Sequence, residues 1–490
     1  VTGNYASSNL KGQEGNQGPY KLVGRNGELY VLVIIGSERV YVNGNLLKRG
    51  QENDYIIDYN SGEIIFTSQF PITSEMRIVV EYQYSENNYS RFITYDGGSF
   101  TDKKWSFGAA LYSESDLKNQ PVQQNLSQEQ AQILAEAGDN TSLMVAPSAV
   151  PDTYDEKKIQ YKKTILGAET IYEYSTDPND ELYNVQFTLV GQAKGNYILT
   201  NPTSVDKIFE YSAPVNGIPQ GNYEPVIQLI APIKSQVATF FGKYNPSEKT
   251  AVSFELAVSN SDQNLFSSID DSNNQGLSGE INAKQRLYSK KWNIDAFANF
   301  QAVQADFKPV ERINSIEFYR DWNVNSVTAT GNQSLLATGI NFNLVPKKKD
   351  STTAANITYA FEKLALSNTY SGIKNNLNAN FEFKKWSIKN DGSYLKSDDL
   401  ENNSTFSRNL SQIRYHHKKN WVGSTIHFED NQEKNKATQQ FSLLSQRFSE
   451  YGIYAGHGDS TKVFFQLGYA RRINDSVQNG LLQRVNTSNS

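Results

Sequence analysis

The residues with the strongest potential for chemistry lie in the acidic segment SNSDQNLFSSIDDSNNQG. Its Asp-x-Asn pattern at 271–273 follows the start of a calcium-binding EF-hand loop, in which oxygen-bearing side chains alternate around the ion. The twelfth loop position needs a bidentate acid but is Asn282, so both the charge and the second oxygen are missing. We therefore expect the segment to join two strands. A looser calcium site is the alternative, with the ligands Asp262, Asp270 and Asp271.

The four histidines form a weaker metal-binding pattern. His416 and His417 are adjacent, so in a strand their side chains point to opposite faces and cannot chelate one ion together. His427 and Glu429 share a face, but two ligands are too few, and we interpret them as a polar pair at a rim or in a lumen.

Sequence motifs for enzyme chemistry are absent. GHGDS at 456–460 lacks the G-x-S-x-G spacing of a serine-hydrolase turn. The sequence has no phosphate-binding or dinucleotide-binding fingerprint and no cysteine. We predict a protein that is not an enzyme, with no catalytic residue, no metal, no cofactor and no small-molecule substrate.

Composition narrows the class of protein. The chain has 490 residues, of which 38% are hydrophobic and 12% aromatic, enough for a large core. Its net charge is -5 with acidic and basic residues interspersed, so nucleic acid is not an expected partner. No stretch approaches the roughly 18 apolar residues of a membrane helix, and any membrane insertion would have to use β-strands.

Residues 29–87 predict a small β-sandwich-like domain after a lead over residues 1–28. Asn43-Gly44 lies between short apolar runs and predicts a type I′ hairpin. The segment Asn60-Ser61-Gly62 separates two further strands, and an alternating run closes the domain. We interpret it as a binding or spacer unit, with a purely structural cap as the alternative.

Residues 88–490 alternate apolar and polar side chains. In 277–287 and 292–302, residues such as Ile281 and Phe300 share one side, whereas Asn282 and Asn299 share the other. This period of two predicts an all-β chain with a long antiparallel up-and-down meander, dry on one face and wet on the other. The meander is either barrel-like or a large rolled sheet in water.

Short Lys-rich turns precede tryptophans at the starts of four strands: Trp105, Trp292, Trp386 and Trp421. The opposite strand ends lead into polar segments that we expect to be long loops, including KSDDLENNS. Aromatic girdles, with short turns at one rim and long loops at the other, are typical of outer-membrane barrels, so these tryptophans are candidate interface aromatics. Lys363 and Arg447 fall on the apolar side, where a charge costs about 2–4 kcal/mol at the midplane of a membrane but only about 0–1 kcal/mol near an interface. Both lie near the ends of their runs, so they do not decide between the two forms.

One segment breaks the β pattern. Ser127 and Gln130 form a capping box, helix-forming residues follow, and Gly138 ends the run. We predict a short helix in an insertion over 113–160, which either docks a partner or is an inert excursion.

A resemblance to a known family adds a functional expectation. The segments that carry it are GPYKLVGRNGELYVLVIIGSERVYVNGNLLKRGQENDYIIDYNSGEIIFT, LAVSNSDQNLFS, ERINSIEFYRDW and GYARRINDSV. Over nearly the whole chain, the sequence resembles the Plug subunit family of the type IX secretion translocon. The resemblance implies a non-enzymatic protein that closes the periplasmic mouth of a large outer-membrane translocon barrel. The implied partners are that barrel and its accessory subunits, on the periplasmic side of the outer membrane.

Two other functions stay open. An autonomous outer-membrane channel fits the alternating strands equally well. A carbohydrate-active or adhesive surface protein would need an aromatic platform beside paired carboxylates, a spacing that the sequence lacks. Because the sequence ends in the polar stretch LLQRVNTSNS, we expect it to be the N-terminal part of a longer protein.

Overall fold

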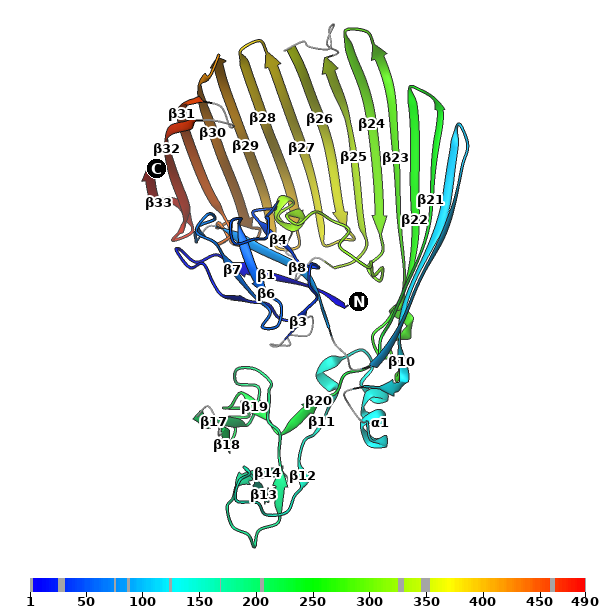
Figure 1. The fold of residues 1–490 in the computed structure, drawn as a ribbon, viewed down its shortest axis with the longest axis vertical. Coiled ribbons are helices and arrows are strands. Elements are labelled where there is room, and N and C mark those ends of the chain that lie inside the picture. The colour runs from blue at the N-terminus through cyan, green and yellow to red at the C-terminus, as the bar shows by residue number, and fades with distance from the viewer. Residues whose placement is uncertain are drawn as a thin grey trace.

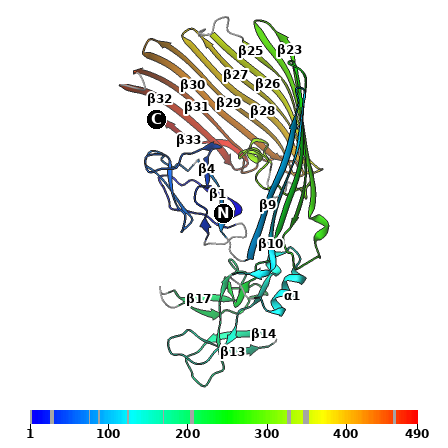
Figure 2. The same cartoon turned by 45° about the vertical axis from the view of Figure 1, so that its right-hand side comes forward.

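The protein is almost entirely β, as predicted, and has three parts (Figure 1). A small N-terminal domain lies inside the curve of a long sheet, and an insertion extends below one rim of that sheet (Figure 2). The structure is a computed structural model that describes residues 3–24, 31–74, 76–85, 89–122, 126–167, 169–202, 207–324, 330–344, 353–458 and 463–489.

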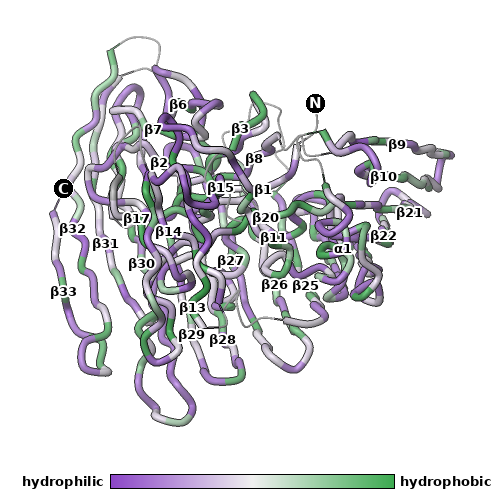
Figure 3. Tube along the Cα trace, turned by 90° about the horizontal axis from the view of Figure 1, so that it is seen from below, coloured by the Kyte–Doolittle hydropathy of each residue, from purple (hydrophilic) through white to green (hydrophobic). Residues whose placement is uncertain are grey.

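The long sheet is the predicted antiparallel meander. Its 15 strands follow chain order apart from one jump, from β10 to β21. The order ends at β9 and β33, which do not pair with each other in the described part of the chain, and the sheet follows an open arc when viewed from below (Figure 3). The large rolled sheet is thus the form observed. Its strands are β9 (Tyr89–Thr101), β10 (Trp105–Pro121), β21 (Lys234–Ser247), β22 (Thr250–Asp262), β23 (Gln275–Ser289), β24 (Trp292–Val303), β25 (Gln333–Leu344), β26 (Thr353–Leu366), β27 (Tyr370–Phe383), β28 (Trp386–Asp399), β29 (Asn402–His417), β30 (Asn420–Asn435), β31 (Gln446–Gly458), β32 (Phe464–Gln478) and β33 (Leu481–Asn489).

The two faces of this sheet have opposite chemistry. Ile281 pairs with Phe300 on the apolar side, and Asn282 pairs with Asn299 on the polar side, which confirms the predicted alternation. We call the first the outer face and the second the inner face. Ile281 is 48% exposed and Phe300 45%, whereas the buried clusters that include sheet residues lie on the inner face, within the described chain. A sheet in water normally buries its apolar face, so this arrangement is inverted.

The two rims differ, largely as predicted. The Lys-rich turns before Trp292, Trp386 and Trp421 are short and lie at the upper rim (Figure 1). Long connections lie at the lower rim, namely 263–274 and the described residues of 304–332 (Figure 1).

The predicted long loop at KSDDLENNS is wrong. β28 extends to Asp399 and β29 begins at Asn402, so only two residues connect them. The Asp399 carboxylate accepts hydrogen bonds from the amides of Glu401 and Asn402, at 2.8 and 2.7 Å, and so builds a tight turn. Polar residues at a solvated rim can continue a strand because pairing uses the backbone.

The N-terminal domain has a core of its own, made by two small sheets. The first contains β1 (Asn4–Lys11), β3 (Leu32–Val33), β4 (Arg39–Val42), β5 (Asn45–Leu46) and β8 (Arg77–Ser85), and the second contains β2 (Tyr20–Lys21), β6 (Tyr55–Asp58) and β7 (Glu63–Phe66). The predicted hairpin at Asn43-Gly44 is confirmed, with positive φ values of 50° and 81° as a type I′ turn requires.

The predicted lead over residues 1–28 is wrong for its described part. β1 pairs with β8 at eight positions, and β2 pairs with β7. Ala6, Tyr20 and Leu22 are buried in the domain core. The sequence NYASSNLK is too polar to show the alternation that predicts a strand. An edge strand can nevertheless form, because it pairs through its backbone and needs little apolar surface.

The insertion also exceeds its predicted bounds of 113–160. β10 runs through Pro121 and the chain rejoins the sheet only at Lys234. The predicted helix is confirmed as α1, with the capping box of Ser127 and Gln130. No helix in the described part of the chain is long and apolar enough to cross a membrane. The other elements are η1 (Thr141–Leu143), β11 (Val145–Pro147), β12 (Val150–Pro151), β13 (Tyr161–Leu166), β14 (Glu169–Tyr174), β15 (Leu182–Asn184), β16 (Thr188–Leu189), β17 (Tyr197–Pro202), β18 (Lys207–Tyr211), β19 (Tyr223–Glu224) and β20 (Val226–Gln228), and α1 spans Gln128–Ala137.

Strands this short gave no periodic signal. The core of the insertion comes from aromatic rings on separate segments, such as Phe187, whose centroid lies 5.0 Å from that of Tyr161 and 4.8 Å from that of Tyr197. Such contacts depend on tertiary packing, so spacing along the chain does not reveal them.

Candidate functional site

The connection between β24 and β25 folds back over the inner face of the sheet. We call residues 304–324 the inner loop; it contains the short helix α2 (Phe318–Asp321). Trp322 is only 2% exposed and packs, with its neighbours in the loop, on side chains from four strands. The buried cluster that they form consists of Phe318, Trp322, Val324, Leu364, Leu366, Tyr370, Leu395 and Phe406. The Tyr370 hydroxyl also donates a hydrogen bond to the Trp322 carbonyl. Each large apolar side chain buried here stabilises the contact by about 1.5–3 kcal/mol, so the loop forms one body with the sheet.

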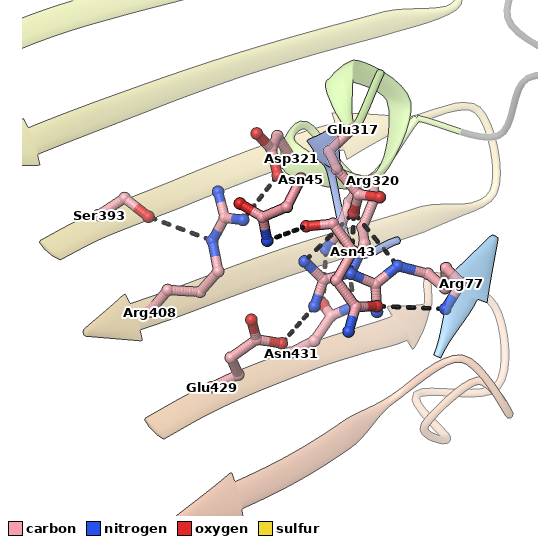
Figure 4. Close-up of polar contacts among 11 residues, drawn as sticks. Asn43, Asn45, Arg77, Glu317, Arg320, Asp321, Ser393, Arg408, Glu429 and Asn431 are labelled. Carbon is pink, nitrogen blue, oxygen red and sulfur yellow. Dashed lines mark hydrogen bonds and ion pairs between the residues drawn. The ribbon is translucent and has the colours of Figure 1, made fainter. Parts of the chain in front are cut away.

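Charged contacts fix the inner loop in place (Figure 4). Arg320 forms an ion pair with Glu429 of β30, and Arg408 Nη1 of β29 lies 2.6 Å from Asp321 Oδ1. Burial lowers the pKa of the Arg320 guanidinium, and Glu429 opposes that effect. Because an unpaired buried charge is costly, these pairs select one position for the loop. Reciprocal amide hydrogen bonds add a further tie, between Asn323 and Asn431.

The other side of the inner loop holds the N-terminal domain. Arg77 of β8 donates to Glu317 Oε2 from Nε and Nη2, at 3.2 and 2.9 Å. Arg312 Nε lies 2.7 Å from Glu81 Oε1, and the Tyr5 hydroxyl donates to the same oxygen at 2.5 Å. Burial disfavours the charged form of Glu81, but the hydrogen bonds from Arg312 and Tyr5 outweigh it and lower the pKa of this carboxyl. These side chains form a charged junction between domain and loop.

A second polar contact joins the domain to the first strand of the sheet. Arg91 of β9 donates from Nη1 to Asn4 Oδ1 at 2.8 Å. The same guanidinium is fixed by Asp116 Oδ1 at 2.7 Å and Glu114 Oε1 at 2.6 Å, both on β10. Arg91 therefore links the start of β1 to two strands of the sheet.

The contacts on the two sides of the inner loop differ in kind. The loop shares a buried apolar cluster with the sheet. The cluster of the N-terminal domain draws only on residues 6–84, so in the described chain the domain is held by charged and polar contacts. Separation of the domain from the loop would therefore expose little of the domain core.

The four candidate tryptophans do not share one face. Trp386 pairs across the strands with Tyr415, and Tyr415 pairs with Val422, so these three side chains share the outer face. Trp421 directly precedes Val422 and therefore lies on the inner face. Trp421 Nε1 donates to Gln466 Oε1 at 3.1 Å. The register places the other three on the outer face at the upper rim, namely Trp105, Trp292 and Trp386.

The acidic segment joins β22 to β23, as predicted, through a loop that contains the short helix η2 (Asp271–Asn273). Its carboxylates accept hydrogen bonds from the backbone. Asp262 Oδ1 accepts from the nearby Asn264 amide at 2.9 Å, and Asp270 Oδ2 accepts from the Asp139 amide of the insertion at 2.9 Å. Burial is the main cause that raises the pKa of Asp139, and the negative charges of three neighbouring aspartates raise this pKa further. The described residues contain no group of three or more His, Asp or Glu side chains able to hold a metal.

The histidine candidates have separate environments. His427 packs its ring on Phe448, with centroids 4.8 Å apart, and Glu429 pairs with Arg320. His416 and His417 are neighbours at the end of β29. Of the GHGDS segment, Asp459 and Ser460 lie outside the described residues.

Sequence reasoning missed the charged residues of the inner loop. The segment ERINSIEFYRDW contains Arg312, Glu317, Arg320 and Asp321, and in the sequence it indicates only the family resemblance. The dense mixture of charged and aromatic residues in a connection between strands could have indicated that this loop packs against the rest of the protein, because a fully solvated loop does not bury aromatic rings.

Comparison with known proteins gives one partial match. A family model described as a domain of unknown function (DUF8818) matches residues 5–86. These bounds agree with the N-terminal domain from β1 to β8 and include residues 5–28 of the predicted lead. No curated protein matches the chain.

Proposed function

We propose that the chain is a non-enzymatic component of a bacterial protein-export complex of the type IX kind, which closes a pore at the periplasmic side of the outer membrane. The observation that carries the proposal is that a domain with its own core is held by ion pairs on the inner loop, and this loop packs on the polar face of a long sheet. The N-terminal domain and the inner loop together obstruct the passage along that face. The type IX assignment and the large translocon barrel as partner come from the sequence resemblance.

The bare outer face supports contact with lipid. Strands β26 to β30 have 14 to 16 residues, more than the roughly 9–11 that a tilted strand needs to cross the hydrocarbon layer. Lipid chains remove the cost of exposed apolar side chains, and three tryptophans lie at the upper rim, where a headgroup layer would begin. Arg447 is paired with Asp475 at 2.7 Å, and Lys363 lies close to the lower end of β26, so neither charge requires burial at the midplane.

Purification from solubilised outer membranes tests the proposal. The tagged chain should recover a very large barrel protein with accessory subunits, and recovery of the chain alone would contradict the export function. Cells that carry Arg77→Glu and Arg312→Glu should also become sensitive to vancomycin, which is too large to cross an intact outer membrane. Arg39→Glu is the matched control, since Arg39 and Glu311 form a longer, exposed pair at 3.6 Å.

An autonomous channel is the second candidate. The inner face carries hydrogen-bonded amides, for example Asn343 Nδ2 donating to Asn341 Oδ1 at 2.5 Å, which suit a water-filled lumen. The channel function predicts that the purified wild-type protein conducts ions in planar bilayers. If the protein instead closes an export pore, the purified wild-type protein should conduct few ions until the ion pairs of the charged junction are broken.

A further inference from the structure

The insertion contains two small sheets with the same strand order. In the first, β13 pairs with β14 on one side and with β15 on the other, and β15 pairs with β12. In the second, β17 pairs with β18 and β19, and β19 pairs with β16. We call residues 150–184, with the first sheet, unit one and residues 188–224, with the second sheet, unit two (Figure 1).

The side chains of the two units also correspond. In each unit a tyrosine opens the central strand and pairs with one tyrosine on either side; these are Tyr161 with Tyr174 and Tyr183, and Tyr197 with Tyr211 and Tyr223. The ring of the opening tyrosine meets the ring on β14 or β18 edge-on, at 6.2 and 5.7 Å, with the same interplanar angle of 71°. The sequences at 171–175 and 208–212, IYEYS and IFEYS, differ only in their second residue.

The backbone beside these segments repeats as well. The Ser175 amide donates to the Gln160 carbonyl at 3.0 Å in unit one, and the Ser212 amide donates to the Asn196 carbonyl at 2.8 Å in unit two. The units differ in β17, where the register shifts between residues 199 and 201. Agreement in strand order, register and sequence indicates two copies of one β unit.

The two units contact each other through reciprocal hydrogen bonds. The Phe209 amide of unit two donates to the Tyr161 hydroxyl of unit one at 3.1 Å. The Tyr172 amide of unit one donates to the Tyr197 hydroxyl of unit two at 2.8 Å. Tyr161 corresponds to Tyr197, and Tyr172 corresponds to Phe209. A contact in which equivalent residues exchange roles is isologous, which is the property of a two-fold axis.

Phe187 lies between the units in the chain and at their interface in space. Its ring centroid is 5.0 Å from that of Tyr161 and 4.8 Å from that of Tyr197, so it contacts the two equivalent rings at nearly the same distance. Both tyrosines are buried, at 1% and 2% exposure. β14 and β18 are the outer strands of their sheets in the described chain, and the reciprocal bonds satisfy one amide of each strand.

We propose that units one and two are copies of one β unit whose tyrosine-bearing surface fits a second copy of itself, and that the insertion is such a pair within one chain. Each copy offers the other a strand amide and a buried tyrosine hydroxyl. The interaction surface of the unit is thus self-complementary, and its partner is supplied by the same chain. This inference does not depend on the proposed export function, because it concerns only contacts within the insertion.

Tyr161→Phe and Tyr197→Phe test the reciprocal contact, since each keeps the ring and removes the hydroxyl. Hydrogen exchange of the full chain, resolved to single amides, is the measurement. In Tyr161→Phe the Phe209 amide should exchange about fivefold faster and the Tyr172 amide should be unchanged, whereas Tyr197→Phe should give the reverse. Equal acceleration of both amides in either variant, or of neither, would overturn the proposal.

Tyr183→Phe is the matched control. Its hydroxyl donates to Glu181 within unit one at 2.6 Å and makes no printed contact with unit two, so neither reporter amide should change by more than about twofold. Acceleration of the Phe209 amide in this variant would mean that the effect comes from loss of any tyrosine hydroxyl, which would contradict the assigned contact.

A chain in which residues 188–224 are replaced by a second copy of 150–184 tests whether the surface fits itself. The inserted copy provides a tyrosine equivalent to Tyr197, so the Tyr172 amide of unit one should stay within about twofold of its wild-type exchange rate. Changing only that inserted tyrosine to phenylalanine should make the same amide exchange about fivefold faster. Loss of protection in the chain with two intact copies would show that the unit does not fit itself and would overturn the proposal.

Discussion

Arg77 donates two hydrogen bonds to one carboxylate oxygen of Glu317, a residue 240 positions further along the chain. Glu317 Oε2 also lies 3.8 Å from Arg320 Nη1, and Arg320 pairs with Glu429 on β30. A continuous line of charges thus runs from the N-terminal domain through the inner loop to the sheet (Figure 4). The domain end of this line is the part that an opening motion would break.

Arg77→Ala should weaken docking of the N-terminal domain by about 0.5–1 kcal/mol, because Arg77 is partly exposed and water screens the pair. The docked fraction can be measured by electron-spin distances between labels on Asn60 and Leu400, both exposed. A double-mutant cycle with Glu317→Ala should show coupling between the two sites, and strictly additive effects would contradict a direct latch.

Trp322→Ala should free the inner loop from the sheet. The side chain is almost fully buried, and its removal should cost about 3–5 kcal/mol of the free energy that holds the loop. Hydrogen exchange across residues 304–324 is the measurement. Trp105→Ala is the control, since that ring is half exposed at the upper rim. Unchanged protection of the loop in Trp322→Ala would show that the loop is held by its charges alone.

Acid should release the N-terminal domain. In the docked state, against the effect of burial, the Arg312 guanidinium of the inner loop lowers the pKa of Glu81, whereas the hydrogen bond from Tyr5 lies within the domain and does not depend on docking. A carboxyl with a lowered pKa contributes its full stabilisation above its ordinary value of 4.5, and this contribution is lost as the pH falls through the lowered value. The docked fraction should therefore fall below about pH 4.5. In Glu81→Gln the domain should dock more weakly at pH 7, and its docked fraction should fall less steeply in acid. A dependence of the docked fraction on pH identical to that of wild type would exclude Glu81 as the group responsible.

Patterns of neighbouring residues correctly predicted those elements that are stabilised by contacts between residues close in the sequence. The Asn43-Gly44 hairpin, the capped helix α1 and the two-sided strands all depend on residues close in sequence. The charged junction joins residues 240 positions apart, and neither Arg77 nor Glu317 is unusual in its own segment. The burial of the polar face was equally hidden, because alternation shows that two faces differ but does not reveal which of them other elements cover.

A charge on the outer face should disturb insertion, whereas the same charge on the inner face should be tolerated. Leu377 and Asn378 are neighbours near the middle of β27 and point to opposite faces. Leu377→Arg should cost about 2–4 kcal/mol at the membrane midplane, and Asn378→Arg much less. The readout is the heat-modifiable, folded fraction in outer-membrane preparations. Equal yields of the two variants would argue for a sheet surrounded by water.

The same two positions test the central claim, that the apolar face of this sheet contacts lipid while the polar face is closed by the N-terminal domain. A bimane label is placed at Leu377 or at Asn378, and the protein is reconstituted in vesicles whose lipids carry bromine on the acyl chains. We predict strong quenching of the label at 377 and little at 378. Quenching at 378 but not 377, or at neither position, would contradict the account.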